Sequence, residues 1–328
     1  MVSNMVSPPI VRMDSAEKIR SALYTGIVGD TLGVPAEEPF THEASLCAVK
    51  NLLGYGRYDQ PLGTWSDDTS MVLCTMESLI RGYDLNDMGK TFCRWLFEAY
   101  WTPFGQVVDC GVTTFLALEE LRSGVAATHS GQRSEDDNGN GCLMRILPST
   151  LFFRNQELDA YLATIHDITA ITHAHPRSKA ACGIYATLMK HLITSHKPKK
   201  DAFFAAMHEA ADYYQRHEEF RPELRHFERI LSGAIASMPR EEISVSGYIV
   251  DTLESSLWCF LNNDSARNVV WATASMGLET DTTSMAAGGL AGAYYGMSGV
   301  PSEWTDSLAR REEIDQLIEK FVQAALRQ

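Results

Sequence analysis

Apolar residues recur at helical spacing along most of the chain. In the first such segment Ile19, Leu23 and Ile27 repeat every four residues, and Asp14 with Glu17 precede them at the spacing of a capping box. The run Gly-Asp-Thr-Leu-Gly and a proline end this segment. The pattern therefore predicts a helix that begins at Asp14 and ends in a glycine-rich turn.

The same spacing predicts helices along the rest of the chain. A second helix begins at Asp67, and the segment 243–250 has strand-like residue types, although Val250, Leu253, Leu257 and Phe260 share one helical face. Further helices are predicted at 87–100, 110–122, 157–172, 177–195, 201–217, 223–237, 247–261, 264–275, 282–296 and 307–326. Residues 36–65 and 128–141 are predicted to be loops.

This pattern predicts an all-α protein. It lacks regular βαβ alternation and a Gly-x-Gly-x-x-Gly motif, which argues against a dinucleotide-binding fold. Neither predicted loop resembles a domain linker, because helices resume on both sides. We therefore expect a flexible tail over residues 1–13 and one domain over residues 14–328, with long functional loops.

Composition narrows the possible partners. The chain has 328 residues, with 28 basic and 42 acidic side chains, for a net charge of −14. Such acidity argues against nucleic acid and anionic membrane surfaces as binding partners. No apolar run is long enough to span a membrane. The seven cysteines form no C-x-x-C pair and indicate reduced core thiols. With no secretory signal at the start, we expect a cytoplasmic protein; no feature specifies an oligomeric state.

Two acidic clusters are the strongest candidates for chemistry. Thr64-Trp-Ser-Asp-Asp-Thr69 and Gly277-Leu-Glu-Thr-Asp-Thr282 each place carboxylates and hydroxyls at the start of a predicted helix. Acids there commonly cap the helix, but oxygen-only groups also suit Mg²⁺ or Mn²⁺. Both interpretations stay open. The helix after the second cluster is rich in glycine and alanine, which favours close packing and would bring Asp281 and Thr282 near the first cluster.

Three further motifs are weak when taken singly. Gly29-Asp-Thr-Leu-Gly-Val-Pro-Ala-Glu37 ends in a carboxylate that is also explained as a solvated loop acid. Asn140-Gly-Cys-Leu-Met-Arg145 offers an amide and backbone N–H groups to phosphate or sugar oxygens. Thr172-His-Ala-His-Pro176 contains two histidines that could bind a metal, but that more often stack on a ligand, cap a helix or stay exposed.

Taken together and in this order, the motifs resemble the ADP-ribosylglycohydrolase family. The matching segments are Gly29-Asp-x-x-Gly33 with Glu37, Ser66-Asp67-Asp68-Thr69, Asp109-x-Gly111-x-Thr113, Asn140-Gly141-x-x-Met144-Arg145, Thr172-His173, and Thr280-Asp281-Thr282 with its small-residue helix. The resemblance spans roughly residues 16–300. It implies a compact, single-domain orthogonal helical bundle. It also implies the family's activity, which is the removal of ADP-ribose from a modified side chain.

The resemblance also implies roles for individual residues and a centre of two Mg²⁺ or Mn²⁺ ions. The implied metal ligands are Ser66, Asp67, Asp68, Glu279, Asp281 and Thr282. The implied catalytic residues are Glu37, as acid/base or orienting carboxylate, with Asp67, Asp68 and Asp281. Asp109, Asn140, Gly141 and His173 would bind the substrate. Two-metal centres of this kind hold sugar hydroxyls and activate water for cleavage of a glycosidic bond.

The sequence departs from the family pattern at two ligand positions. Glu279 stands where the family usually has Asp in Gly-Gly-Asp-x-Asp-Thr, and Ser66 stands where Thr is frequent. We expect a metal-dependent hydrolase that cleaves ADP-ribose from a protein side chain or from a related small conjugate. The alternative, favoured by Glu279, is a catalytically silent family member that binds ADP-ribose or has a structural role.

Overall fold

The computed structural model describes residues 13–36 and 58–328. Its elements in chain order are α1 (Ser15–Gly33), η1 (Val34–Ala36), α3 (Asp67–Arg81), α4 (Leu85–Glu98), α5 (Val112–Arg122), η3 (Asn140–Cys142), α6 (Leu147–Phe152), α7 (Leu158–Thr169), α8 (Pro176–Thr194), α9 (Lys199–Arg216), η4 (Arg221–Phe227), α10 (Glu228–Leu231), η5 (Ala234–Ser237), η6 (Arg240–Glu242), α11 (Ile249–Asn262), α12 (Ala266–Ala274), α13 (Thr280–Tyr295), α14 (Ser302–Asp306) and α15 (Arg311–Ala325). In these two ranges the only β-pairing is two isolated bridges, so the all-α prediction is confirmed.

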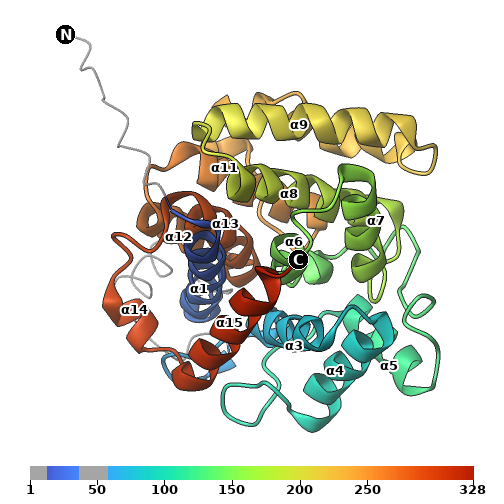
Figure 1. Ribbon diagram of the computed structural model, residues 1–328, viewed down its shortest axis with the longest axis vertical. Helices are drawn as coiled ribbons and strands as arrows, with labels where there is room; N and C mark the ends of the chain where they lie inside the picture. Colours follow the sequence, from blue (N-terminus) through green and yellow to red (C-terminus); the bar gives the residue numbers. More distant parts are fainter. Residues whose placement is uncertain (1–12, 37–57) are drawn as a thin grey trace.

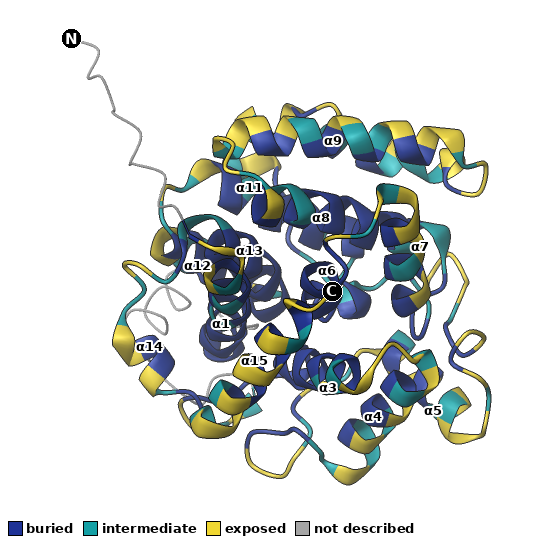
Figure 2. Ribbon diagram, in the orientation of Figure 1, coloured by how far each residue is buried: buried dark blue, intermediate teal, exposed yellow. Residues whose placement is uncertain are grey.

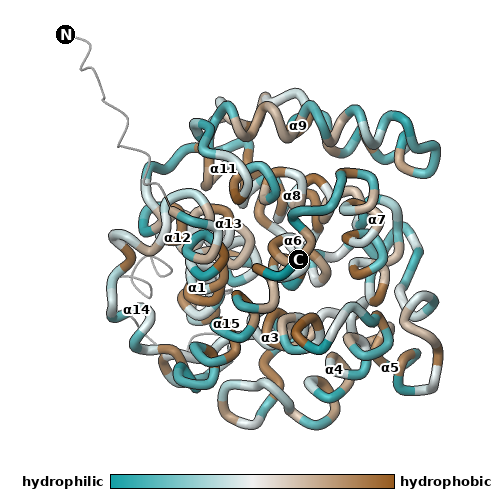
Figure 3. Tube along the Cα trace, in the orientation of Figure 1, coloured by the Kyte–Doolittle hydropathy of each residue, from teal (hydrophilic) through white to brown (hydrophobic). Residues whose placement is uncertain are grey.

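Helices α1, α8 and α13 form the buried centre of the molecule, and α9, α14 and α15 lie on its outside (Figures 1 and 2). The outer helix α9 is hydrophilic over much of its length (Figure 3). Buried apolar residues from Ile19 in α1 to Ala325 in α15 make one continuous core cluster. Within the described ranges, no helix has the length and apolar character needed to cross a bilayer.

Helices α1 and α13 approach each other backbone to backbone. A Cβ atom on Gly29 would lie 2.3 Å from the Ser284 carbonyl oxygen, and one on Gly33 would lie 2.4 Å from the Asp281 Cα atom. Only residues without a side chain can form such a contact. The hydroxyl of Thr280 adds a hydrogen bond of 2.9 Å to the Gly33 carbonyl oxygen. The start of α13 is thereby held against the end of α1, as the small-residue pattern predicts.

Most predicted helices are found with ends shifted by a few residues, but the prediction of a helix over 223–237 was wrong. That segment consists of the 3₁₀ turns η4 and η5 on either side of the four-residue helix α10. Gly233 has a φ angle of +81°, in the left-handed region, and this ends α10. The pattern also missed α6, whose Pro148 lies in its first turn and whose six residues are all buried.

The ends of α1 illustrate why the sequence pattern was informative. The Asp14 carboxylate accepts a hydrogen bond of 2.8 Å from the Glu17 N–H, so the predicted cap is present. The predicted tail lies outside the described residues except for Met13, which is buried. The boundary between tail and domain stays a prediction.

Candidate active site

Helix α3 begins with the first acidic cluster. Ser66 is its N-cap, and the Ser66 hydroxyl oxygen accepts a hydrogen bond of 3.2 Å from the Asp68 N–H. Ser66, Asp67 and Asp68 are all buried, with at most 5% of any of them exposed. Carboxylates at a helix start favourably meet the positive end of the helix dipole. Their burial, however, has a large desolvation cost that a surface cap would avoid.

The second acidic cluster meets the first. The Thr282 hydroxyl, in the first turn of α13, donates a hydrogen bond of 3.2 Å to Asp68 Oδ1. Asp281 is also buried, and its Oδ1 atom accepts a hydrogen bond of 2.7 Å from the Thr282 N–H. Residues 214 positions apart in the chain therefore share one polar site. The proximity expected from the small-residue helix is confirmed.

Asp68 shows that helix capping alone does not account for the first cluster. Its Oδ1 atom accepts from Thr282, and its Oδ2 atom is buried without a hydrogen-bond partner. Burial and the nearby charges of Asp281, Asp30 and Asp67 raise the pKa of the Asp68 carboxyl well above its usual value. A buried carboxylate oxygen without a donor, beside other carboxylates, is the arrangement that a bound cation would stabilise.

Asp30, in the last turns of α1, was not assigned a role from the sequence. It is fully buried and accepts hydrogen bonds from the Ser66 hydroxyl at 2.9 Å, the Ser66 N–H at 3.2 Å and the Thr69 N–H at 3.0 Å. Burial raises the pKa of the Asp30 carboxyl, and these hydrogen bonds oppose the rise. The Gly29-Asp-x-x-Gly33 motif contained this residue, but an acid inside a helical pattern carries no signal of what lies across from it.

Glu279, within the second acidic cluster, also faces a neighbouring loop. It is the N-cap residue of α13 but makes no side-chain cap hydrogen bond. Its Oε2 atom is 3.5 Å from Asn140 Nδ2, and its carboxylate lies next to Gly247. The same Asn140 amide donates to the Thr252 hydroxyl at 3.2 Å. The structure thus brings together one predicted ligand and one predicted substrate residue.

Gly141 and His173 lie in contact at the same loop. A Cβ atom on Gly141 would be 3.1 Å from His173 Cε1 and 2.8 Å from the Thr114 hydroxyl oxygen, which is buried without a hydrogen-bond partner. Burial, with a smaller effect of Arg145, lowers the pKa of His173 to about 3, so the imidazole is neutral at pH 7. The Thr172 hydroxyl accepts from Arg145 at 2.7 Å and lies 2.8 Å from His173 Nδ1. When the Thr172 hydroxyl donates to Nδ1, the proton of His173 lies on Nε2.

Asp109 occupies a strained backbone position. It has a φ angle of +60° and is exposed, and its Oδ1 atom accepts from the Cys110 N–H at 2.8 Å. Burial, with smaller effects of the Asp67 and Asp109 charges, raises the pKa of Cys110 to about 12. Left-handed backbone at a non-glycine residue is often found where a side chain is held for function.

The chain matches the family model for ADP-ribosylglycohydrolase over residues 12–328. The chain belongs to the ADP-ribosylglycohydrolase family. This confirms the resemblance and the expected class of enzyme, an ADP-ribosyl hydrolase.

Several members of the ADP-ribosylglycohydrolase family are similar over nearly their full length. The ADP-ribosylarginine hydrolase Tri1 of Serratia proteamaculans (strain 568) is 30% identical over 324 residues, covering 96% of this chain and 82% of that protein. The ADP-ribosyl-[dinitrogen reductase] glycohydrolase of Rhodospirillum rubrum is 30% identical over 292 residues, covering 87% and 88%. A solved ADP-ribosylglycohydrolase-related protein complex superposes with a TM-score of 0.76 at 27% identity, covering 95% of this chain and 99% of that one. The family's helical fold is therefore also that of this chain.

The metal ligands that the family resemblance implies are oxygen donors at the two acidic clusters. In the part of the chain that the structure describes, no three histidine, cysteine, aspartate or glutamate side chains form a metal cage by themselves. The available set is mixed: the Asp68 Oδ2 atom lacks a donor, the Thr282 hydroxyl lies at Asp68 Oδ1, and the Ser66 hydroxyl lies at the Asp68 N–H. Oxygen donors of this kind fit Mg²⁺ or Mn²⁺. The predicted catalytic residue Glu37 lies outside the described residues.

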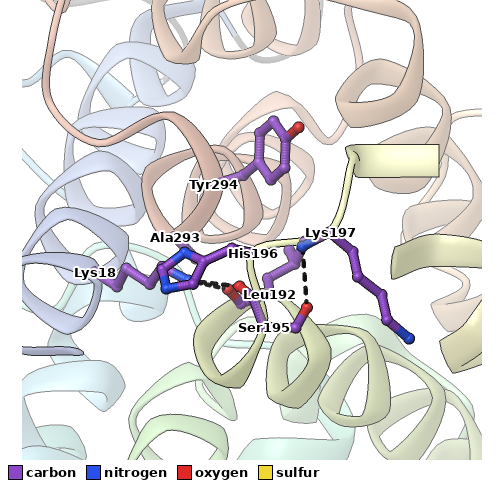
Figure 4. A pocket seen from close by; sticks show the side chains of 7 residues that line it. All are labelled: Lys18, Leu192, Ser195, His196, Lys197, Ala293 and Tyr294. Carbon is purple, nitrogen blue, oxygen red and sulfur yellow. Dashed lines mark hydrogen bonds between the residues drawn. The ribbon is translucent and has the colours of Figure 1, made fainter. Parts of the chain in front are cut away.

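The other candidate motifs have structural roles in this family member. His175 caps α8, because its Nδ1 atom accepts from the Arg177 N–H at 3.1 Å, which agrees with the capping alternative. The described cysteines are free thiols, as predicted, at positions 74, 93, 110, 142, 182 and 259. A small pocket elsewhere in the molecule is lined by Lys18 (Figure 4). The Lys18 ammonium donates to three carbonyl oxygens at the end of α8. Lys18 thereby caps that helix.

Proposed function

We propose that this protein hydrolyses the bond between ADP-ribose and an arginine side chain of a modified protein, with the help of two Mg²⁺ or Mn²⁺ ions. The observation that carries the metal dependence is the buried, donor-free Oδ2 atom of Asp68, which lies where two acidic clusters meet. The arginine specificity is supported by the names of relatives from Serratia proteamaculans and Pseudomonas putida, both ADP-ribosylarginine hydrolases.

Oxygen donors from both clusters would hold the ions. Asp67 and Asp68 come from the start of α3, with Ser66 beside them, and Asp281 and Thr282 come from the start of α13. When bound, the two ions would hold ribose hydroxyls, activate the attacking water and neutralise charge near the diphosphate. The negative net charge of the chain is then compatible with an anionic substrate, because the cations reverse the local sign.

The loop at Asn140 would bind the rest of ADP-ribose. His173 is neutral, and in the tautomer with the proton on Nε2 that atom presents it toward the Gly139–Gly141 backbone. From there it can donate a hydrogen bond to a ribose or phosphate oxygen without adding charge. The Asn140 amide provides a second donor, held by Thr252. Asp109, on its left-handed turn, would contact the group that leaves.

Cleavage needs one group to protonate the departing guanidine and one to take a proton from water. We assign this acid/base role to Glu37, on the family resemblance alone. Burial and charge repulsion raise the pKa of the Asp68 carboxyl, so cation binding there would be coupled to release of its proton.

A substrate panel tests this proposal. Proteins and peptides that carry ADP-ribose on arginine or on serine are incubated with Mg²⁺, Mn²⁺ or EDTA, and released ADP-ribose is quantified by chromatography. We expect release from the arginine conjugate, only with metal, and loss of release in Asp67→Asn. Asp201→Asn, an exposed acid on α9, is the matched control.

The alternative of a silent ADP-ribose-binding protein rests on Glu279, which replaces the usual aspartate and contacts Asn140. Calorimetry with ADP-ribose separates the two. If the protein binds ADP-ribose and Mn²⁺ but releases no product from any conjugate, the hydrolase proposal is wrong and the binding function is supported.

A further inference from the structure

Asp30 is a buried carboxylate whose hydrogen bonds all go to the start of another helix. It lies on α1, fully buried, and its two oxygens accept from the Ser66 hydroxyl, the Ser66 N–H and the Thr69 N–H at distances of 2.9–3.2 Å. Burying an acid this deeply has a large desolvation cost, so we expect Asp30 to have a specific role at this position. Its partners are the first residues of α3, where the proposed metal ligands begin.

Because of these contacts, the carboxylates proposed as metal ligands do not have to cap α3. The first N–H groups of a helix need acceptors outside the helix. At α3, Asp30 accepts from the N–H groups of Ser66 and Thr69, and Ser66 Oγ accepts from the N–H of Asp68. The Asp68 Oδ2 atom is consequently left without a donor, although it lies in the first helical turn.

The hydrogen bond from Ser66 to Asp30 also fixes the direction of the hydroxyl proton. A serine hydroxyl has one proton and two lone pairs. The proton is donated to Asp30 Oδ1 at 2.9 Å, and one lone pair accepts from the Asp68 N–H at 3.2 Å. One lone pair of Ser66 Oγ remains, and it is the part of a hydroxyl that can bind a cation.

We propose that Asp30 is a positioning residue for the metal site, which accepts the Ser66 proton and thereby makes the Ser66 oxygen available as a metal ligand. This inference rests on the metal centre in the proposed function. Its position is rigid, because the glycines on either side of it, Gly29 and Gly33, contact the α13 backbone directly. Asp30 thus links the start of α3 to the same interface that holds Asp281 and Thr282.

A double-mutant cycle on Mn²⁺ affinity tests the role of Asp30. In Asp30→Asn the side chain has one acceptor oxygen for two donors, the Ser66 hydroxyl and the Thr69 N–H. With the oxygen on the Thr69 N–H, the amide nitrogen faces Ser66, whose hydroxyl then accepts from it and turns its proton to the metal side. Losing such a supporting hydrogen bond typically weakens metal binding by about 10–100-fold. We expect this loss by calorimetry in Asp30→Asn and in Ser66→Ala. The double variant should be within about 3-fold of either single one, since both remove the same ligand.

Two controls separate positioning from folding. Asp14→Asn changes the carboxylate cap at the other end of α1 and should leave Mn²⁺ affinity unchanged. Ser66→Thr keeps the hydroxyl and should retain wild-type affinity. Urea unfolding in EDTA measures the stability of each variant apart from metal binding.

Several outcomes would overturn the inference. If the effects of Asp30→Asn and Ser66→Ala multiply, Asp30 acts through the fold and not through the Ser66 hydroxyl. If Asp30→Asn does not fold, Ser66→Ala decides alone: unchanged Mn²⁺ affinity removes Ser66 as a ligand and Asp30 as its support. Either result is compatible with release of ADP-ribose by the wild type and leaves the proposed function intact. If the wild type binds no Mn²⁺, the proposed metal centre is wrong as well.

Discussion

The contact between α1 and α13 predicts a large effect of one methyl group. In Gly33→Ala the new Cβ atom would lie 2.4 Å from Asp281 Cα and 2.5 Å from its backbone nitrogen. Carbon atoms pack at about 3.5–4.0 Å, so the helices must separate by about 1 Å. The hydrogen bond from Thr282 to Asp68, now 3.2 Å, would then exceed hydrogen-bonding distance. Overpacking of this kind typically costs about 1–3 kcal/mol of stability.

The loss of activity should exceed what the loss of stability explains. A displacement of about 1 Å at a catalytic centre can lower the rate about 100-fold. We expect kcat/KM for ADP-ribose release to fall by about that factor at a temperature where urea titration shows Gly33→Ala to be folded. Gly89→Ala on α4 is the matched control, because its methyl group meets only side-chain atoms of Leu121 and Ala127. Normal activity and Mn²⁺ affinity in a folded Gly33→Ala would refute the claim that this contact sets the geometry of the site.

Three further predictions follow from single residues. If the proposed two-ion centre is present, Glu279→Gln should lower the number of Mn²⁺ ions bound per chain from two to one, and Glu279→Asp should keep both. Two ions bound to the glutamine variant would show that Glu279 serves Asn140 and not a metal ion. Leu278 has a φ angle of +62°, so Leu278→Gly should raise the free energy of unfolding by about 1 kcal/mol, and Leu278→Ala should not; equal values in urea titrations would contradict this. Burial lowers the pKa of His166 to about 3. Below about pH 6.5 the unfolded chain takes up this proton and the folded chain does not. The free energy of unfolding should therefore decrease as the pH is lowered from about 6 to 4, and His166→Gln should reduce that slope by up to about 1.4 kcal/mol per pH unit. An unchanged slope would show that His166 is protonated in the folded state.

Helix positions could be predicted from the sequence where apolar residues repeat over several turns. Helices α1, α3 and α8 are examples, since each buries one or more faces against the core. The helix predicted over 223–237 was wrong, because a local pattern does not reveal that the glycine at position 233 adopts a positive φ angle. Helix α6 was not predicted, because a short and completely buried helix has no polar face and hence no alternation of apolar and polar residues to recognise.

The candidate site could be predicted as to residue type but not as to its internal contacts. Paired acids and hydroxyls before two helices indicated Asp68 and Thr282, and the glycine-rich helix indicated that they meet. The hydrogen bonds of Asp30 could not be predicted, because they cross between two helices whose relative rotation is set by packing. The approach of Glu279 to Asn140 depends in the same way on how two loops meet.

The meeting of α1 and α13 has a consequence for synthesis on the ribosome. Asp68 and Thr282 are 214 residues apart, and at about 5–20 residues per second the second is made roughly 10–40 s after the first. During that interval the glycine-lined face of α1 has no partner, and the carboxylates at the start of α3 lack both the Thr282 hydroxyl donor and the proposed cation ligands from α13. The nascent chain therefore depends on delayed closure by its own last third, and this interval is when it is most exposed to chaperones and proteases.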